Sequence, residues 1–391
     1  MLSADLRSRE FHRILLIKLS AMGDVVQTIP VLNKLRRRYP AAQLDWLTTP
    51  PIAELLRFNP AINDVIEFGR DEWAAPWRLR PFVSSARLAA KLKRSRYDLV
   101  LDLQGQLRSA IFARATGAAA RIGFDRPRRQ AWRASSRKIP DNARRHAWQG
   151  AREGSWLAYT DPIPLPNIDI HPVDRYLGLG PMLGLDDGAP DFSFPIPPAA
   201  VVRIDALLDF YGVAKTKLIA MAPGTIWETK RWRRDGFAEC ARHFLGNGFA
   251  VALIGSPGER AVCEEVATLA PGAINLAGET TLSELAALIR RSALCISNDS
   301  GPMHLAVALG RPVVAIFGPT DPVWAGPYHR DGAVLRADLP CSPCYLRLLR
   351  QCRHRHACMS DIGAAQVIER AERVLRDATG TRPALAQAAR S

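Results

Sequence analysis

The sequence has no long hydrophobic run, which limits how the protein can meet a membrane. No apolar stretch in the 391 residues reaches the roughly 18 residues that a membrane-spanning helix needs. The opening residues, MLSADLRSREFHR, are mixed in charge and lack the apolar centre of a secretory signal. We therefore expect the protein to stay in the cytoplasm.

Cysteine is scarce as well, with seven in the whole chain, too few for a disulfide scaffold. Four that lie close in sequence would suit zinc, whose structural sites take four thiolate or imidazole ligands. Their spacing, C-x2-C-x7-C-x5-C, differs from the paired C-x2-C of common zinc ribbons. We favour a loop of reduced thiols or an incidental disulfide, and expect no metal and no cofactor. These cysteines are Cys341, Cys344, Cys352 and Cys358.

Several binding signatures are also missing. The first strand-turn-helix of the chain has neither the G-x-G-x-x-G fingerprint of dinucleotide binding nor the G-x-x-x-x-G-K-[ST] phosphate loop. The chain has no helix-turn-helix, RRM or zinc-finger signature. A basic nucleic-acid-binding protein is therefore only a remote alternative, and we expect no nucleic-acid partner.

Positive charge is present in excess and is unevenly spread. Residues 1–150 hold 28 lysines and arginines against 13 aspartates and glutamates, which accounts for the whole net charge of +15. The rest of the chain holds 25 of each. This asymmetry indicates an anionic partner for the first part of the chain, such as nucleic acid, an anionic membrane surface or an acidic substrate. A solvated basic face is the alternative.

Short apolar runs alternate with helical patterns along the chain, which is typical of doubly wound parallel sheets. The segment 186–200 is rich in proline, glycine and aspartate and separates two such series as a linker. We predict an N-terminal domain over 1–185, a C-terminal domain over 201–362, and a final helix with a frayed tail over 363–391. The predicted strands are 12–19, 43–48, 64–68, 98–103, 218–222, 249–254, 273–276, 293–297 and 312–317.

Candidate site residues follow several of these strands, because open α/β sheets bind ligands at the carboxyl ends of their strands. Gly23 and Asp24 follow the first strand, and Gln104 follows the fourth. A lone aspartate in such a turn is more commonly a helix cap, and this alternative stays open for Asp24.

The turn at 298–302, NDSGP, leads from a strand into a helix. A helix that begins there presents free N–H groups and the positive end of its dipole to a phosphate. The alternative is an ordinary unit whose cap serves only the helix. Lys230, in APGTIWETKRW, is expected at the same edge. It suits a diphosphate leaving group, on which negative charge grows, although most lysines are simply solvated.

Five segments, in order over most of the chain, resemble the heptosyltransferase family of lipopolysaccharide biosynthesis. They are KLSAMGDVVQTIPVLNKLRRRYP, DLVLDLQGQLRSA, HPVDRYLGLGPMLG, APGTIWETKRW and NDSGPMHLAVALGRPVVAIFGPTDP. The resemblance implies a GT-B fold, with two Rossmann-like α/β domains facing each other across a cleft. It also implies inverting, metal-independent transfer of heptose from ADP-heptose to the Kdo/inner-core region of lipopolysaccharide. A glycosyltransferase of surface polysaccharide synthesis that uses another nucleotide sugar is the alternative.

The resemblance also implies roles for individual residues. Asp24 corresponds to the general base that takes the proton from the acceptor hydroxyl. Lys230 and Thr225 correspond to residues that hold the diphosphate, above a helix N-terminus formed by Ser300 and Gly301. The donor-binding residues implied in this way are Gly224, Thr225, Lys230, Glu259, Asp299, Ser300, Gly301 and His304.

Three of these residues have less settled roles. Asp299 is expected to meet sugar hydroxyls or to order its turn. Glu259 is the candidate for the ribose hydroxyls. His304 occupies the histidine position of the motif, although a histidine there can also pack or cap.

The basic first domain fits a lipid-borne acceptor such as Kdo-bearing lipid A at the inner face of the cytoplasmic membrane. Residues 71–96 mix tryptophans with arginines and lysines, as in segments that lie in a lipid headgroup layer. A surface helix that covers its own sheet is the alternative. The expected acceptor-binding residues are Gly23, Gln104, Arg78, Arg80, Arg128 and Arg129.

Overall fold

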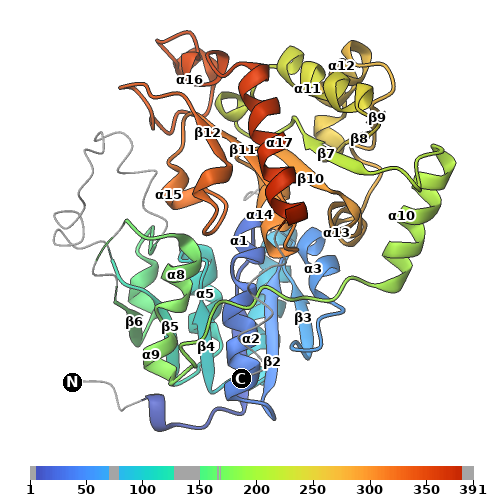
Figure 1. Cartoon of the computed structure of the whole chain (residues 1–391). Helices are drawn as coiled ribbons and strands as arrows, with labels where there is room; N and C mark the ends of the chain where they lie inside the picture. Colours follow the sequence, from blue (N-terminus) through green and yellow to red (C-terminus); the bar gives the residue numbers. More distant parts are fainter. Residues whose placement is uncertain (1–5, 70–78, 127–149, 165–166, 168, 381–391) are drawn as a thin grey trace. The chain divides into compact units, whose positions relative to one another are not determined.

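The structure is a computed structural model that describes residues 6–69, 79–126, 150–164, 167 and 169–380. Contacts divide the chain into two units, Met1–Pro195 and Ile196–Ser391. Each unit is built on a six-stranded parallel sheet with flanking helices (Figure 1). The predicted fold class, two Rossmann-like parallel-sheet domains, is therefore confirmed.

The first sheet has the strand order β3-β2-β1-β4-β5-β6. The order reverses between β1 and β4, which pair in parallel. At such a switch point the two neighbouring strands lead their connections to opposite faces, and the carboxyl ends leave room for a ligand. The strands are β1 (Arg13–Ile17), β2 (Gln43–Thr48), β3 (Asp64–Glu67), β4 (Leu99–Asp102), β5 (Ala120–Phe124) and β6 (Asp161–Ile163).

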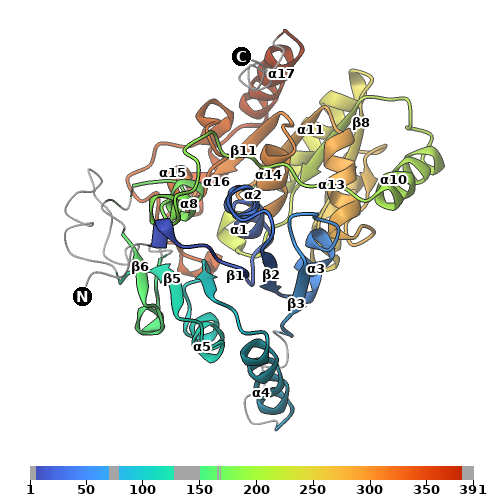
Figure 2. The ribbon, with the colours of Figure 1, turned by 90° about the horizontal axis from the view of Figure 1, so that it is seen from below.

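Helices cover both faces of this sheet, which explains why its central strands are apolar on both sides. Figure 2 shows α4 and α5 on one face and α2 on the other. Leu92 of α4 and Phe112 of α5 share a buried core with Val100 of β4. The helices of this unit are η1 (Leu6–Ser8), α1 (Met22–Val26), α2 (Ile29–Arg38), α3 (Pro50–Leu56), α4 (Leu79–Arg94), α5 (Leu107–Ala115), η3 (Ser155–Ala158), α8 (Pro172–Leu177) and α9 (Gly180–Leu183).

Two local predictions differ from the structure. The helical pattern over 25–39 is two helices, α1 and α2, because Pro30 starts a new first turn. The glycine, proline and serine content of residues 121–138 predicts a loop and that of 160–166 a connection, but these segments contain most of β5, which pairs with β4 and β6, and the edge strand β6. Glycine and proline in these short strands hide the β signal, which is tolerable near a sheet edge.

The second sheet repeats the plan with the order β12-β11-β10-β7-β8-β9 and a switch point between β7 and β10. All five residues of β7 and of β10 are buried. The strands are β7 (Leu218–Ala222), β8 (Ala250–Leu253), β9 (Ile274–Asn275), β10 (Leu294–Asn298), β11 (Val313–Phe317) and β12 (Val334–Arg336).

The helices of the second unit pack on both faces of this sheet. The last of them contributes Val367 and Ala371 to the same core as Phe237. That this helix also packs on the first domain stays a prediction. The helices are α10 (Pro198–Phe210), η4 (Glu228–Lys230), α11 (Arg234–Gly246), η5 (Pro257–Glu259), α12 (Arg260–Leu269), α13 (Leu282–Arg291), α14 (Gly301–Ala308), α15 (Pro322–Ala325), η6 (Asp331–Ala333), η7 (Leu349–Gln351), α16 (Ala357–Ser360) and α17 (Ala364–Gly380).

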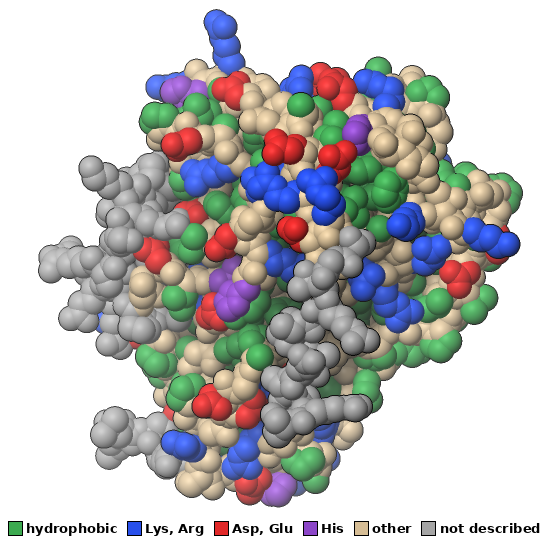
Figure 3. Space-filling model, viewed as in Figure 1, with side chains coloured by type: hydrophobic (Ala, Val, Ile, Leu, Met, Phe, Trp, Pro, Cys, Tyr) green, Lys and Arg blue, Asp and Glu red, His purple; other side chains and the backbone are tan. Residues whose placement is uncertain are grey.

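Charge on the surface of the second unit is mixed in sign. On the face drawn in Figure 3, acidic and basic side chains lie side by side over this unit. This agrees with the balanced charge of the corresponding sequence. Within the described residues, no helix is long and apolar enough to cross a bilayer.

Candidate functional site

Two loops of the second unit meet at the carboxyl ends of β7 and β10. The amide of Asn298, the last residue of β10, connects them. Its Nδ2 donates to the carbonyl oxygen of Pro223 at 2.8 Å, and its Oδ1 accepts from the backbone N–H of Trp232 at 3.1 Å. Asn298 is fully buried, so these bonds hold both ends of the 223–232 loop against the turn that starts α14.

Lys230 and Asp299 form an ion pair at this switch point. The Nζ of Lys230 lies 2.7 Å from Oδ2 of Asp299, and both side chains are largely buried. The Thr320 hydroxyl, in the loop after β11, donates to the same carboxylate oxygen at 2.6 Å. Lys230 and Asp299, which the sequence places in separate turns at one edge of the sheet, are therefore in contact.

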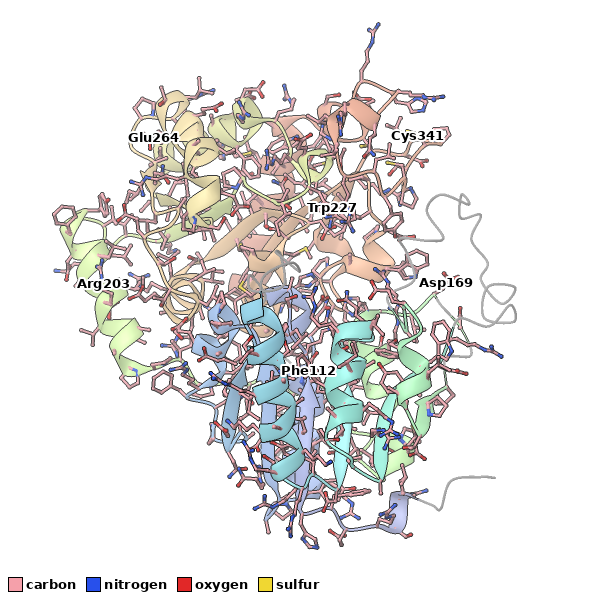
Figure 4. All side chains as sticks on the ribbon, turned by 180° about the vertical axis from the view of Figure 1, so that it is seen from behind. Phe112, Asp169, Arg203, Trp227, Glu264 and Cys341 are labelled. Carbon is pink, nitrogen blue, oxygen red and sulfur yellow. The ribbon has the colours of Figure 1, made fainter. Side chains whose placement is uncertain are left out.

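Aromatic and backbone contacts fix the rest of the lysine loop. The Lys230 ammonium lies 4.5 Å from the ring centroid of Trp227, and the Arg347 guanidinium lies 4.7 Å from the same centroid (Trp227 is labelled in Figure 4). Arg231 donates from Nε to the carbonyl oxygen of Thr225 at 2.9 Å. The indole of Trp227 thus holds two cations, one of which is already paired with Asp299.

The N-terminus of α14 lies beside this cluster. Ser300 is the N-cap residue, but its side chain makes no capping bond. Its hydroxyl instead lies 2.9 Å from that of Ser297. Pro302 has no N–H and the N–H of Met303 donates to the carbonyl oxygen of Ser300 at 3.2 Å, so the start of α14 offers an anion the N–H of Gly301 and the positive end of the helix dipole. His304 is half-buried one turn into this helix.

Gly224 and Glu259 are in close contact across the ends of β7 and β8. A Cβ on Gly224 would lie 2.6 Å from Cδ of Glu259, so only glycine fits there. Oε2 of Glu259 accepts hydrogen bonds from the N–H and the hydroxyl of Ser256, each at 2.7 Å. The carboxylate thus has a fixed orientation over the glycine turn.

In the first unit, Gln104 joins the turns that follow β1 and β4. Its Oε1 accepts from the N–H groups of Leu19 at 3.0 Å and Ser20 at 3.3 Å. Asp24 lies in the first turn of α1, half-buried, and its Oδ2 accepts from the N–H of Ala21 at 3.3 Å. The predicted pair of turns is therefore adjacent, and Asp24 also acts as a helix cap.

A buried lysine supports this edge. Lys18 donates from Nζ to the carbonyl oxygen of Leu103 at 2.9 Å and to the Tyr176 hydroxyl at 2.8 Å. Burial alone would lower the pKa of Lys18, but Tyr176 and the nearby Asp24 outweigh it and hold that pKa above its ordinary value. Burial raises the pKa of Tyr176, against the effect of Lys18. The pair is thus an ammonium and a neutral phenol, with the positive charge near Asp24.

A second buried carboxylate, Asp102, shapes the turn after β4. Its Oδ1 accepts from the N–H groups of Gln104 and Gly105, and its Oδ2 accepts from the Tyr159 hydroxyl at 2.9 Å. Burial raises the pKa of Asp102, while these hydrogen bonds act in the opposite direction. Asp102 has its oxygens occupied and serves to orient Gln104.

The predicted acceptor arginines cannot be placed. Arg78, Arg128 and Arg129 lie outside the described residues, and Arg80 lies in α4 without a described side chain. The seven cysteines are free thiols (Cys341 is labelled in Figure 4). In the described part of the chain, no three His, Cys, Asp or Glu side chains are grouped to hold a metal.

Comparison with known proteins agrees with this geometry. The family model described as glycosyltransferase family 9 (heptosyltransferase) matches residues 85–354. The chain belongs to this family. Lipopolysaccharide heptosyltransferase 1 of Pseudomonas aeruginosa is 31% identical over 85% of this chain and 86% of its own length. Lipopolysaccharide heptosyltransferase 3 of Escherichia coli is 28% identical over 79% and 84%.

Solved structures of family members share the fold. A family 9 glycosyltransferase from Veillonella parvula has a TM-score of 0.75 at 22% identity, covering 96% of this chain and 99% of its own. The E. coli heptosyltransferase WaaC with ADP-2-deoxy-2-fluoro heptose has a TM-score of 0.68 at 22% identity, covering 92% and 99%. The resemblance read from the sequence is confirmed, and the protein is a glycosyltransferase.

Several residues at the carboxyl edges of the two sheets were not predicted as site residues from the sequence. Lys18 begins the segment KLSAMGDVVQTIPVLNKLRRRYP, and a lysine at the end of an otherwise apolar strand indicates a functional position. Tyr176 lies in the segment HPVDRYLGLGPMLG. Its contact with Lys18 joins residues 158 positions apart, so a local sequence pattern does not predict it. Asn298 opens the NDSGP turn and reads there as a cap residue, whereas its bonds to the 223–232 loop, and that of Thr320 to Asp299, depend on which strands are neighbours.

Proposed function

We propose that the protein transfers heptose from ADP-heptose to the Kdo/inner-core region of lipopolysaccharide, with inversion and without a metal ion. The Lys230–Asp299 ion pair at the head of α14 is the observation that carries the proposal. It puts a fixed cation beside a helix N-terminus, as a departing diphosphate requires. The matched relatives named as lipopolysaccharide heptosyltransferases support this choice of donor and acceptor class.

On the donor side, the bond between the anomeric carbon and the diphosphate oxygen breaks, and the diphosphate leaves with added negative charge. Lys230, Thr225 and the positive end of the α14 dipole at Ser300 and Gly301 are proposed to hold that charge. Removing one such electrostatic partner typically costs about 10²- to 10³-fold in kcat. Glu259 is proposed to accept hydrogen bonds from the ribose hydroxyls.

Asp299 is proposed to act through Lys230. Its carboxylate holds the ammonium in place and lowers the entropy lost when the diphosphate binds. Thr320 in turn fixes the carboxylate rotamer. An additional contact of Asp299 with sugar hydroxyls remains part of the proposal. His304 is proposed to line the same donor site.

On the acceptor side, Asp24 is proposed as the general base. It takes the proton of the acceptor hydroxyl while that oxygen attacks the anomeric carbon from the face opposite the leaving group. The positive charge of Lys18 lies near Asp24. Gly23 and Gln104 are proposed to border the acceptor sugar.

The first domain is proposed to bind the acceptor at the inner face of the cytoplasmic membrane. Its excess of positive charge suits Kdo-bearing lipid A, which carries carboxylates and phosphates. The proposed contacts to these anions are Arg78, Arg80, Arg128 and Arg129.

A transfer assay with defined substrates tests the proposal. The purified protein is given ADP-heptose and Kdo-bearing lipid A, and ADP release and the glycolipid product are measured with and without a chelator. We expect chelator-independent transfer, and NMR of the product should show an inverted anomeric centre. Faster transfer from a UDP-sugar would favour the alternative donor, and retention of configuration would contradict the mechanism.

A further inference from the structure

A groove on the outer side of the first unit is not used by the proposed chemistry. It has a volume of about 760 Å³ and lies between the second half of α4, the outward side of α5 and the 3-10 helix η3. Figure 4 shows this side of the molecule, with α4 and α5 in front of their sheet. The inward side of α5 is buried through Phe112, so its outward side forms the wall of the groove.

Large apolar side chains are exposed along this groove. Leu107 and Ile111, one helical turn apart on α5, are 49% and 47% exposed, and Leu157 of η3 is 83% exposed. Small residues form much of the remaining lining, which keeps the groove open. These are Ala89, Ala90, Ala110, Ala115, Gly117 and Ala158. Of the five large apolar side chains that are exposed in the described part of the first unit, three line this groove, which favours an apolar ligand there.

The charged residues that line the groove are both cations, Lys93 and Arg114. Among the residues that the structure describes, neither forms an ion pair with a carboxylate. One acid lies at the end of the groove, where Glu153 accepts the N–H of Leu107 at 3.2 Å. The groove therefore combines apolar walls with two cations for which the described residues provide no carboxylate partner.

We propose that this groove binds the anionic phospholipid of a bilayer, with apolar walls against acyl chain and Lys93 and Arg114 against headgroup phosphate. The combination matters because an apolar insertion or a few cations alone gives only weak membrane binding, whereas two signals together give stable binding. The inference rests on the proposed function, in which the acceptor is carried by a lipid.

The position of the groove fits that role. Leu107, at one end of the groove, follows Gln104 by three residues, and Gln104 contacts the turn that leads to Asp24. A bilayer held along α5 would thus present its headgroup layer to the same sheet edge as the proposed base. A nucleic acid fits less well, because its affinity comes mainly from phosphate contacts and an apolar floor adds nothing to them.

Vesicle flotation of the full-length protein tests the proposal. Vesicles of phosphatidylcholine are compared with an equimolar mixture of phosphatidylcholine and phosphatidylglycerol. We expect binding to the mixed vesicles that weakens with added salt. Ile111→Asp with Leu157→Asp should lower partitioning at least about tenfold, since each leucine-sized side chain contributes roughly 1.5–3 kcal/mol when buried. Lys93→Glu with Arg114→Glu should lower it about thirtyfold or more, at about 1 kcal/mol for each of the two cations.

Matched controls come from α10, which carries an exposed Phe210 and an exposed Arg203. Phe210→Asp and Arg203→Glu should leave vesicle binding unchanged. Thermal melting tests whether each variant is folded. If the Ile111→Asp, Leu157→Asp double variant is not folded, Leu157→Ser alone replaces it in the binding measurement. Equal binding of wild type and groove variants overturns the proposal, as does an equal loss in the α10 variants.

Two further outcomes identify another occupant and overturn the proposal. If the apolar variants turn an oligomer into a monomer in light scattering with vesicle binding intact, the groove is a contact between copies. If they increase vesicle binding, the groove is covered by another part of the same chain.

Transfer to a deacylated, water-soluble acceptor should be unchanged in the groove variants. Failure of that reaction in the wild type would count against the proposed function, not against the groove.

Discussion

Lys230 Nζ lies 2.7 Å from Oδ2 of Asp299, and the pair joins the loop after β7 to the turn after β10. These are the two strands at which the order of the second sheet reverses. The ion pair therefore places an oriented ammonium at the position where doubly wound sheets bind their ligands.

Asp299→Asn removes the charge that positions Lys230 while keeping the size of the side chain. We expect kcat/KM for ADP-heptose to fall about ten- to hundredfold, because a small misplacement of a catalytic group costs that much. Lys230→Met should be at least as severe. Asp235→Asn, at an exposed ion pair with Arg233, is the matched control and should have no effect.

A double-mutant cycle separates positioning from an independent role of Asp299. If Asp299 acts only through the lysine, Asp299→Asn adds little to Lys230→Met. Fully additive losses in kcat/KM would show instead that Asp299 contacts the substrate on its own.

Gly224→Ala should weaken donor binding without touching the donor directly. The added Cβ would lie 2.6 Å from Cδ of Glu259, so the carboxylate must leave its position. We expect about a tenfold weaker affinity for ADP by calorimetry, the value of one hydrogen bond to a charged group. Gly246→Ala is the control, because a Cβ there meets nothing within 4 Å. Equal ADP affinity in wild type and Gly224→Ala would remove Glu259 from the ribose site.

Lys18→Met should disturb the turns that Lys18 supports. The Lys18 ammonium donates to the carbonyl oxygen of Leu103 and to the Tyr176 hydroxyl, and losing a buried donor typically costs about 1–3 kcal/mol. We expect a lower melting temperature and a lower kcat/KM, whereas Tyr176→Phe keeps the ammonium and should lower both less. An unchanged kcat/KM in a folded Lys18→Met variant would show that Lys18 only supports the fold.

The sequence predicted the strand-turn-helix units well, because buried parallel strands such as β7 and β10 are continuous apolar runs bounded by glycine and proline turns. It also predicted which turns meet, since parallel strands end at a common edge. Two short strands at the sheet edges were not predicted. β12 has only three residues, and β6 contains Pro162.

Side-chain partners across distant segments were beyond the sequence pattern. Asn298 bonds to Pro223 across 75 positions, and Thr320 reaches Asp299 only because β11 pairs with β10. Such contacts depend on strand order, which a local pattern does not contain. The family resemblance supplied the residues of the proposed donor site, while the structure shows how those residues contact one another.

The role of Asp24 is the central claim, and single-turnover transfer by Asp24→Asn tests it most directly. Enzyme in excess over ADP-heptose is mixed with Kdo-bearing lipid A, and product formation is followed by mass spectrometry beside ADP calorimetry. We expect the transfer rate to fall about 10²- to 10⁴-fold, as for loss of a general base, with ADP affinity unchanged. Transfer within a few-fold of the wild-type rate would contradict the account.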